Sequence, residues 1–170
     1  MTESVSYTIR RTPLGLLLVA GTARGVCQVR FGANEAGLVA ALVRELPCAA
    51  LENGGARVAR WADALADAAE GRGDAGRVPL DVAGSRFQRR VWDALRRIPR
   101  GATRGYGELA DALGHEGAAR AVANACAANP TPLAVPCHRV VPKSGGVGGY
   151  RFGGWRKRAL LAAEAESRSS

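Results

Sequence analysis

The spacing of apolar residues changes once along the chain, and this change limits the possible folds more than any other feature. Residues 5–9, 14–20 and 26–31 form short apolar runs separated by proline- and glycine-containing turns, a pattern typical of strands in an antiparallel meander. In the second half of the chain the apolar residues recur at helical spacing. We therefore expect an α/β protein with two lobes. An N-terminal antiparallel sheet with helices is predicted over residues 1–84, and a mainly helical C-terminal lobe over residues 85–170.

Two helices are expected beside the strands. Asn34 is a suitable N-cap for a helix over residues 35–46, and a second apolar stripe favours a helix over residues 56–70. Residues 78–82 are expected to form a short extended segment. No group of residues in this half has the type and spacing that a chemical site needs, so we interpret the first lobe as a scaffold.

The second half begins with the pattern of a helix N-terminus. Ser85 and Gln88 are spaced for a capping box, and Pro99 ends the helix that follows. Two short helices are then expected over residues 106–113 and 118–128, with a glycine-containing turn between them. Such a pair is typical of a helix-turn-helix, which places its second helix on DNA.

The second helix of this pair is rich in alanine and carries one charge, that of Arg120. Small side chains offer few hydrogen bonds to base edges, but they allow a helix to come close to the narrow minor groove. An alanine-rich helix is equally typical of a buried core, so both interpretations remain open at this point. The alanines are Ala118, Ala119, Ala121, Ala123, Ala125, Ala127 and Ala128.

Charge is divided unevenly between the two halves. The formal net charge is +9. Residues 1–84 hold 9 Lys and Arg against 9 Asp and Glu, whereas residues 85–170 hold 15 against 6. The whole excess lies in the half with the helix-turn-helix pattern, as expected for a protein that binds a polyanion such as nucleic acid. The alternative is an arginine-rich composition without functional meaning, but such a bias would not spare the first half.

A cysteine in a stiff stretch of chain is the strongest candidate for a reactive group. Pro136 precedes Cys137, His138 follows it, and a glycine-rich loop lies over residues 145–149. A neighbouring imidazole or positive charge lowers the pKa of a thiol and so favours the nucleophilic thiolate. The alternative is a buried thiol beside a histidine with satisfied hydrogen bonds, which is the usual state of a free cysteine.

The spacing of the cysteines favours free thiols. They show neither C-x-x-C spacing nor clustering, so we expect no disulfide framework, no metal site with either histidine, and no cofactor. The chain has no apolar run of about 18 residues and no secretory signal pattern at its start, so we expect a cytoplasmic protein without a membrane partner. The cysteines are Cys27, Cys48, Cys126 and Cys137.

Residues 136–141 (PCHRVV) resemble the acceptor-site signature of the O6-alkylguanine-DNA alkyltransferases, also called methylated-DNA–protein-cysteine methyltransferases. Tyr106, residues 120–130 and residues 149–153 support this resemblance in order and spacing. Residues 87–166 are similar in particular to the C-terminal half of the bacterial adaptive-response (Ada) proteins, and the first half is similar more weakly. The resemblance implies a ribonuclease H-like N-terminal lobe and a monomer in the bacterial cytoplasm.

The resemblance assigns catalytic roles to four residues. Cys137 would accept an alkyl group, and His138 would take the thiol proton through a bound water. Glu164, on a final helix expected to begin near Trp155, would orient that histidine. Asn129 would brace the turn beneath the site.

Contacts with substrate and DNA are implied in the same way. Tyr106 would donate its hydroxyl to the guanine ring, and Arg120 would replace the extruded nucleotide in the base stack. Arg139 would hold the loop through an ion pair or contact a phosphate. The remaining contacts would come from helix alanines, from the chain around the pocket and from one lysine, namely Ala118, Ala119, Ala121, Val140, Tyr150, Arg151 and Lys157.

The implied activity is direct-reversal DNA repair by a methylated-DNA–[protein]-cysteine S-methyltransferase. An alkyl group on O6-alkylguanine, and on O4-alkylthymine, in duplex DNA would pass irreversibly to Cys137, so that each molecule reacts once. Two alternatives remain: a non-enzymatic module that binds alkylated DNA, and a Cys-His hydrolase that releases product repeatedly. Gly105 stands where many members of the family have serine or threonine, so a hydroxyl near the DNA phosphate is missing.

Overall fold

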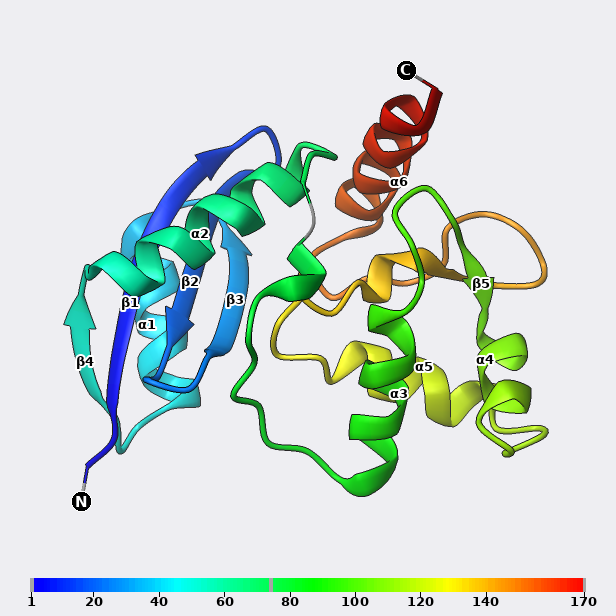
Figure 1. Ribbon diagram of the computed structural model, residues 1–170, viewed down its shortest axis with the longest axis horizontal. Coiled ribbons are helices and arrows are strands. Elements are labelled where there is room, and N and C mark those ends of the chain that lie inside the picture. Colours follow the sequence, from blue (N-terminus) through cyan, green and yellow to red (C-terminus); the bar gives the residue numbers. More distant parts are fainter. Residues whose placement is uncertain (1, 74, 170) are drawn as a thin grey trace.

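Two lobes lie side by side in the computed structural model, which describes residues 2–73 and 75–169 (Figure 1). The outermost residues of the two predicted lobes, Met1 and Ser170, lie outside this part of the chain. The N-terminal lobe contains a four-stranded sheet in the order β3-β2-β1-β4. Its strands are β1 (Ser4–Thr12), β2 (Gly15–Gly21), β3 (Val26–Gly32) and β4 (Ala50–Asn53).

The first three strands form the antiparallel meander that the apolar runs predict. Leu17 and Val19 of β2 pack on one face of the sheet, and Leu18 and Ala20 pack on the other. All four side chains are fully buried, so both faces of the sheet are covered. The sheet also contains a strand that the sequence did not predict, since β4 pairs in parallel with the start of β1 and departs from the antiparallel arrangement.

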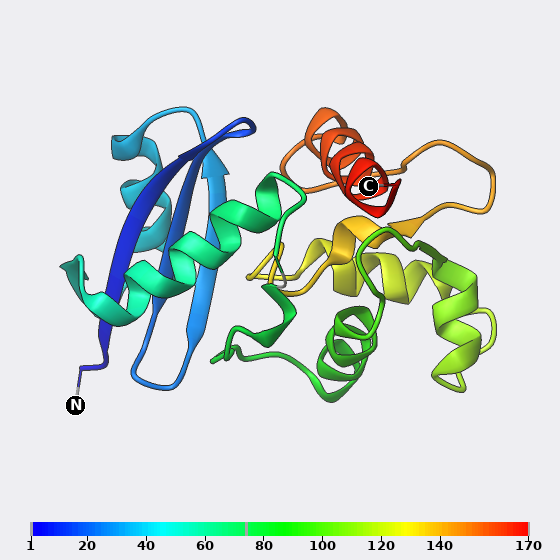
Figure 2. The same ribbon diagram turned by 45° about the horizontal axis from the view of Figure 1, so that its top comes forward.

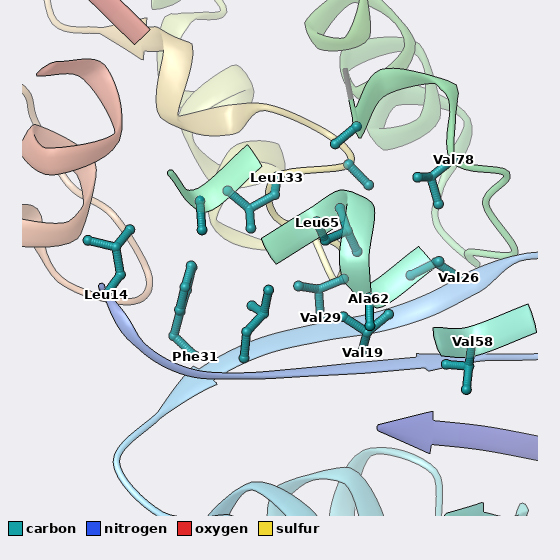
Figure 3. Packing of buried hydrophobic residues seen from close by; sticks show 14 of the residues in the cluster. Leu14, Val19, Val26, Val29, Phe31, Val58, Ala62, Leu65, Val78 and Leu133 are labelled. Carbon is teal, nitrogen blue, oxygen red and sulfur yellow. The ribbon is translucent and has the colours of Figure 1, made fainter. Parts of the chain in front are cut away.

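One helix covers each face of the sheet (Figures 1 and 2). α1 (Glu35–Glu45), which Asn34 caps as predicted, packs Leu38 and Leu42 onto one face. α2 (Ala56–Ala69) places its apolar stripe on the opposite face, within the cluster shown in Figure 3. Apolar burial holds the layers of this lobe together, and an ion pair from Arg10 of β1 to Asp63 of α2 at 2.9 Å joins the sheet to the helix at the surface.

The C-terminal lobe is mainly helical, which confirms the predicted fold class. α3 begins at the predicted capping box, in which Ser85 and Gln88 exchange both hydrogen bonds, at 2.9 and 3.1 Å. α4 and α5 form the helix-turn-helix pair beside it (Figure 1). The α-helices of this lobe are α3 (Arg86–Arg96), α4 (Tyr106–Ala112), α5 (Ala119–Ala127) and α6 (Gly154–Ser169).

Short elements link these helices. A 3-10 turn, η1 (Ala75–Arg77), precedes α3, and a second one, η2 (Cys137–Arg139), packs against α6. The two-residue strands β5 (Arg104–Gly105) and β6 (Val140–Val141) pair in parallel, and the sequence did not predict them. No helix in the described part of the chain is long and apolar enough to span a membrane.

Loops between the lobes cover the free edge of β3. Backbone N–H groups of this strand donate to carbonyl oxygens outside the sheet, from Val26 to Pro79 at 2.8 Å and from Val29 to Pro130 at 2.9 Å. The Asp81 N–H donates to the Val26 carbonyl at 2.8 Å. The bond from Val29 to Pro130 ties the sheet directly to the segment that leads to Cys137.

The two lobes also share apolar packing. Leu133, Ala134 and Leu160 of the C-terminal lobe are buried in the cluster between the sheet and α2. Leu133 lies next to Leu65 of α2 in Figure 3. The division of the chain after residue 84 therefore remains a prediction, because a continuous core runs across it.

Candidate active site

A tightly folded segment presents Cys137. Residues 130–136 contain three prolines, and Leu133 adopts a positive φ of 75°, which is uncommon for a residue other than glycine. The Thr131 carbonyl accepts a hydrogen bond from the Val135 N–H at 2.9 Å, and the Val135 carbonyl accepts one from the Cys137 N–H at 2.8 Å. These bonds and the apolar packing of the segment fix the start of η2, so the thiol is held in one place.

Asn129 braces this segment from below. Its Nδ2 donates to the Val135 carbonyl at 2.9 Å and to the Cys137 Sγ at 3.3 Å. Its Oδ1 accepts from the Thr131 N–H at 3.0 Å. Asn129 is buried, and an amide donor aimed at sulfur stabilises negative charge on that sulfur.

His138 and Glu164 form a buried pair behind the thiol. The His138 Nε2 lies 2.7 Å from the Glu164 Oε1. Burial alone raises the pKa of Glu164, but hydrogen bonds from His138 and Arg139 lower it to about 2, so the carboxylate is ionised. Burial lowers the pKa of His138 in spite of this carboxylate, so the imidazole is neutral at pH 7.

These charge states determine the tautomer of His138. A neutral ring next to an ionised carboxylate donates its Nε2–H, which leaves Nδ1 without a proton. The Nδ1 atom is buried and makes no hydrogen bond within residues 2–73 and 75–169. The imidazole can therefore accept a proton at Nδ1 while Glu164 stabilises the resulting cation.

The guanidinium of Arg139 makes its hydrogen bonds within the protein. Its Nε lies 3.1 Å from the Glu164 Oε2, its Nη2 lies 2.8 Å from Oε1, and its Nη1 donates to the Ile98 carbonyl at 2.7 Å. The guanidinium thus joins α6 to the end of α3 behind η2. Arg139 does not line the pocket that contains Cys137.

A pocket of about 460 Å³ opens above the thiol, within the size range of small-molecule sites. Cys126 and two alanines on the same side of α5 form part of its wall, and the sequence analysis did not assign them to the site. The helical spacing of positions 123, 126 and 127 could have indicated that these residues face the same way. The lining residues are Tyr106, Ala123, Cys126, Ala127, Cys137, Pro142, Gly148, Gly149, Tyr150 and Arg151.

Lys157 brings a positive charge to the pocket wall although its side chain is fully buried. Its Nζ donates to the Val140 carbonyl at 2.6 Å, to the Gly149 carbonyl at 3.2 Å and to the Tyr106 hydroxyl at 3.3 Å. Burial lowers the pKa of Lys157, and the nearby thiols oppose this shift. Two of these bonds hold residues of the pocket wall, namely Gly149 and Tyr106, in place.

Tyr106 keeps its proton at neutral pH. Burial raises the pKa of its hydroxyl to about 12, and negative charge on Cys126 or Cys137 contributes in the same direction. Because the oxygen accepts from Lys157, its hydrogen is free to point into the pocket. Tyr150 also lines the pocket, and burial raises the pKa of its hydroxyl as well.

The Cys137 thiol is protonated at rest. Burial raises its pKa, while the hydrogen bond from Asn129 and the charges of Lys157 and Arg151 lower it by less. Nucleophilic attack therefore requires a base as well as nearby positive charge.

The described residues contain no group of three His, Cys, Asp or Glu side chains that could hold a metal ion.

α5 contributes to the pocket wall on one side and exposes residues of its first turn on another. Arg120 and Ala121 are exposed, whereas Ala118 and Ala119 are half-buried at the start of the helix. Arg120 has no hydrogen-bond or ion-pair partner in the part of the chain that the structure describes. The predicted site residues thus fall into two groups, one around the thiol and one on the outer side of α5.

The position of the pocket defines the class of protein. It lies between the second helix of a helix-turn-helix and a segment that carries a buried cysteine beside an imidazole and a carboxylate. The protein therefore holds a buried thiol directly behind a helix-turn-helix, a motif typical of proteins that bind DNA.

Comparison with known proteins identifies the family. Residues 86–166 match the model of the "6-O-methylguanine DNA methyltransferase, DNA binding domain". The solved structure of Mycobacterium tuberculosis OGT in complex with DNA is 37% identical and covers 95% of this chain and 93% of its own, with a TM-score of 0.79. The chain belongs to the O6-methylguanine-DNA methyltransferase family.

Two curated relatives complete the comparison. The chain is 40% identical over 96% of its length to the bifunctional transcriptional activator/DNA repair enzyme Ada of Escherichia coli, covering 46% of that protein. It is 56% identical over 51% of its length to the methylated-DNA–protein-cysteine methyltransferase of M. tuberculosis, covering 53% of that protein. The chain thus spans about half the length of the curated relatives it matches.

Proposed function

We propose that this protein repairs alkylated DNA by transferring the alkyl group of O6-alkylguanine, and of O4-alkylthymine, to the sulfur of Cys137. The observation that supports this most directly is a buried thiol at a base-sized pocket, next to a histidine whose Nδ1 is free to accept a proton. The names of its relatives point to the same reaction. A neutral thioether is not hydrolysed, so each molecule reacts once.

The reaction needs one proton transfer and one substitution. His138 takes the thiol proton at Nδ1 through a water, and Glu164 stabilises the imidazolium that forms. The thiolate then attacks the alkyl carbon, a carbon–sulfur bond forms, and the bond from carbon to O6 breaks. The electron pair remains on the guanine, where the Tyr106 hydroxyl donates a hydrogen bond to the anion.

The remaining pocket residues hold the base and the thiol in position. Lys157 and Asn129 stabilise the thiolate, one by its charge and the other by its amide hydrogen bond. The backbone at Val140 and Arg151 would read the edges of the guanine, and Tyr150 would form part of the wall. These roles rest on the contacts described above and on the family resemblance.

Double-stranded DNA would bind to the outer side of α5. The alanines at positions 118, 119 and 121 allow close approach to the minor groove, and Arg120 would occupy the space that the flipped nucleotide leaves. The net charge of +9 favours such a partner. We place the protein in the bacterial cytoplasm, where its free cysteines would stay reduced, and expect it to act as a monomer.

An intact-mass measurement tests the proposal. The protein is mixed with a short duplex that contains one O6-methylguanine, and the modified residue is then located by peptide mapping. We expect a single methyl group on Cys137 that saturates at one per protein. Tight binding of the lesion without a mass change would instead support the non-enzymatic binding module, and repeated product release would support a hydrolase.

Replacing Arg120 by alanine is expected to slow the repair of duplex DNA more than the reaction with free O6-benzylguanine. Reaction with the duplex includes the free-energy cost of unstacking the nucleotide, whereas the free base enters the pocket without this cost. We expect about a tenfold loss on duplex, which corresponds to about 1.4 kcal/mol. Single-turnover rates on both substrates measure the difference, and Arg60→Ala, at an exposed arginine of α2, is the matched control. Equal losses on both substrates would contradict a role in flipping.

A further inference from the structure

A carboxylate of the N-terminal lobe, that of Glu45 at the end of α1, lies beside Arg151 of the pocket wall. Its Oε1 lies 3.9 Å from the Arg151 Nη2 and 3.8 Å from the Arg30 Nη1. Both distances are longer than a hydrogen bond, so a single oxygen is shared loosely between two guanidinium groups. Arg151 lies beyond the glycine-rich loop, whereas Arg30 belongs to β3.

Arg30 is poorly satisfied in this arrangement. Its side chain is only 17% exposed, and its Nη1 is buried without a hydrogen-bond partner among the described residues. Burial lowers the pKa of Arg30, the positive charges of Arg151 and Arg44 lower it further, and Glu45 opposes them. Two guanidinium groups, those of Arg30 and Arg151, therefore share one carboxylate in this cluster, and a second anion would be favourable there.

Arg151 faces both this cluster and the pocket. It lines the pocket wall, and its charge contributes to lowering the pKa of the Cys137 thiol. Its side chain is 34% exposed, so it can reorient toward solvent. An exposed ion pair of this length holds its partners weakly and exchanges readily with another anion.

We infer that Glu45 is a positioning residue that holds Arg151 at the edge of the pocket in the free protein and releases it to a backbone phosphate when duplex DNA binds. On release, the carboxylate is free to close onto Arg30, whose Nη1 makes no hydrogen bond to any described residue. The scaffold lobe thereby takes part in DNA recognition without touching DNA at this point. This inference rests on the proposed function, since it requires DNA at the mouth of the pocket.

The affinity for an unmodified duplex tests this exchange independently of alkyl transfer. Glu45→Gln, which keeps the shape of the side chain, is expected to bind about threefold more tightly at low salt, because Arg151 no longer has to leave a carboxylate. In an Arg151→Gln background the same change is expected to have no effect. Glu52→Gln removes an exposed carboxylate from β4 and is the matched control for net charge.

A double-mutant cycle of dissociation constants, measured by fluorescence anisotropy, separates the outcomes. Coupling between positions 45 and 151 supports the inference, and a merely structural role of Glu45 would not produce it. Equal effects of Glu45→Gln and Glu52→Gln, or an unchanged effect in the Arg151→Gln background, would overturn it. If the coupling appears but Cys137 of the wild-type protein takes up no methyl group, the exchange stands and the proposed repair activity fails.

Discussion

Cys137→Ser is expected to abolish methyl uptake completely while the variant still binds duplex DNA. The serine hydroxyl is nearly isosteric with the thiol, but it is a far weaker acid and His138 cannot deprotonate it to a useful extent. The pocket wall and the outer side of α5 remain unchanged, so the lesion can still be bound. Intact mass after incubation with an O6-methylguanine duplex, together with an electrophoretic binding assay, measures both properties.

The chain offers a matched control for this experiment. Cys48 is a free and exposed thiol in the turn between α1 and β4, far along the chain from the pocket. Cys48→Ser is expected to take up one methyl group per protein, as the wild type does. Methyl uptake by the Cys137→Ser variant, or its loss in Cys48→Ser, would show that the acceptor has been assigned to the wrong residue.

Glu164→Gln is expected to cause the second large effect, on both reaction rate and stability. The amide cannot stabilise an imidazolium at His138, so we expect methyl transfer to slow by about 100-fold or more. It also leaves the partly buried Arg139 guanidinium without its counter-ion, at a cost of about 3 kcal/mol in the free energy of unfolding. Single-turnover kinetics and urea unfolding at pH 7 measure the two losses.

The pH dependence of unfolding distinguishes this ion-pair role from simple packing. The pKa of Glu164 is lowered to about 2 from its ordinary value of 4.5, so its ionisation stabilises the folded protein above pH 4.5, and this stabilisation is lost as the pH falls from 4.5 to 2. We expect Glu164→Gln to lose less stability than the wild type over that window. Parallel acid profiles of the wild type and Glu164→Gln would contradict this assignment. A profile like that of the wild type in Glu164→Gln, together with an altered profile in the control Glu52→Gln, would contradict it as well.

Local signals in the sequence were sufficient for most of the helices and strands. The Asn34 cap and the capping box of Ser85 and Gln88 depend on residues three positions apart, and the structure contains both. β4 escaped prediction because it is only four residues long and is stabilised by pairing with the distant start of β1. β5 and β6 escaped for the same reason, since each has only two residues.

The site shows the same division between local and distant information. Cys137 and His138 are adjacent in sequence, and the motif around them was informative by itself. Without the family resemblance, no spacing rule connects His138 with Glu164, because α6 brings them together in space. The contact of Glu45 with Arg151 crosses between the lobes at the edge of ion-pair distance, so no sequence pattern could have indicated it.

The covered edge of β3 affects how readily the protein aggregates when many copies are present in one cell. If the proposed reaction consumes the protein, one copy is needed for each lesion, and exposed sheet edges promote aggregation at high concentration. Here the chain around Pro79, Asp81 and Pro130 takes up hydrogen-bonding groups of β3. The opposite edge is formed by β4, which is only four residues long and mostly exposed, and beyond it by residues 8–12 of β1, which carry the charges of Arg10 and Arg11. Neither edge is a good template for a strand from a second molecule, so the fold is suited to remaining dispersed while it accumulates.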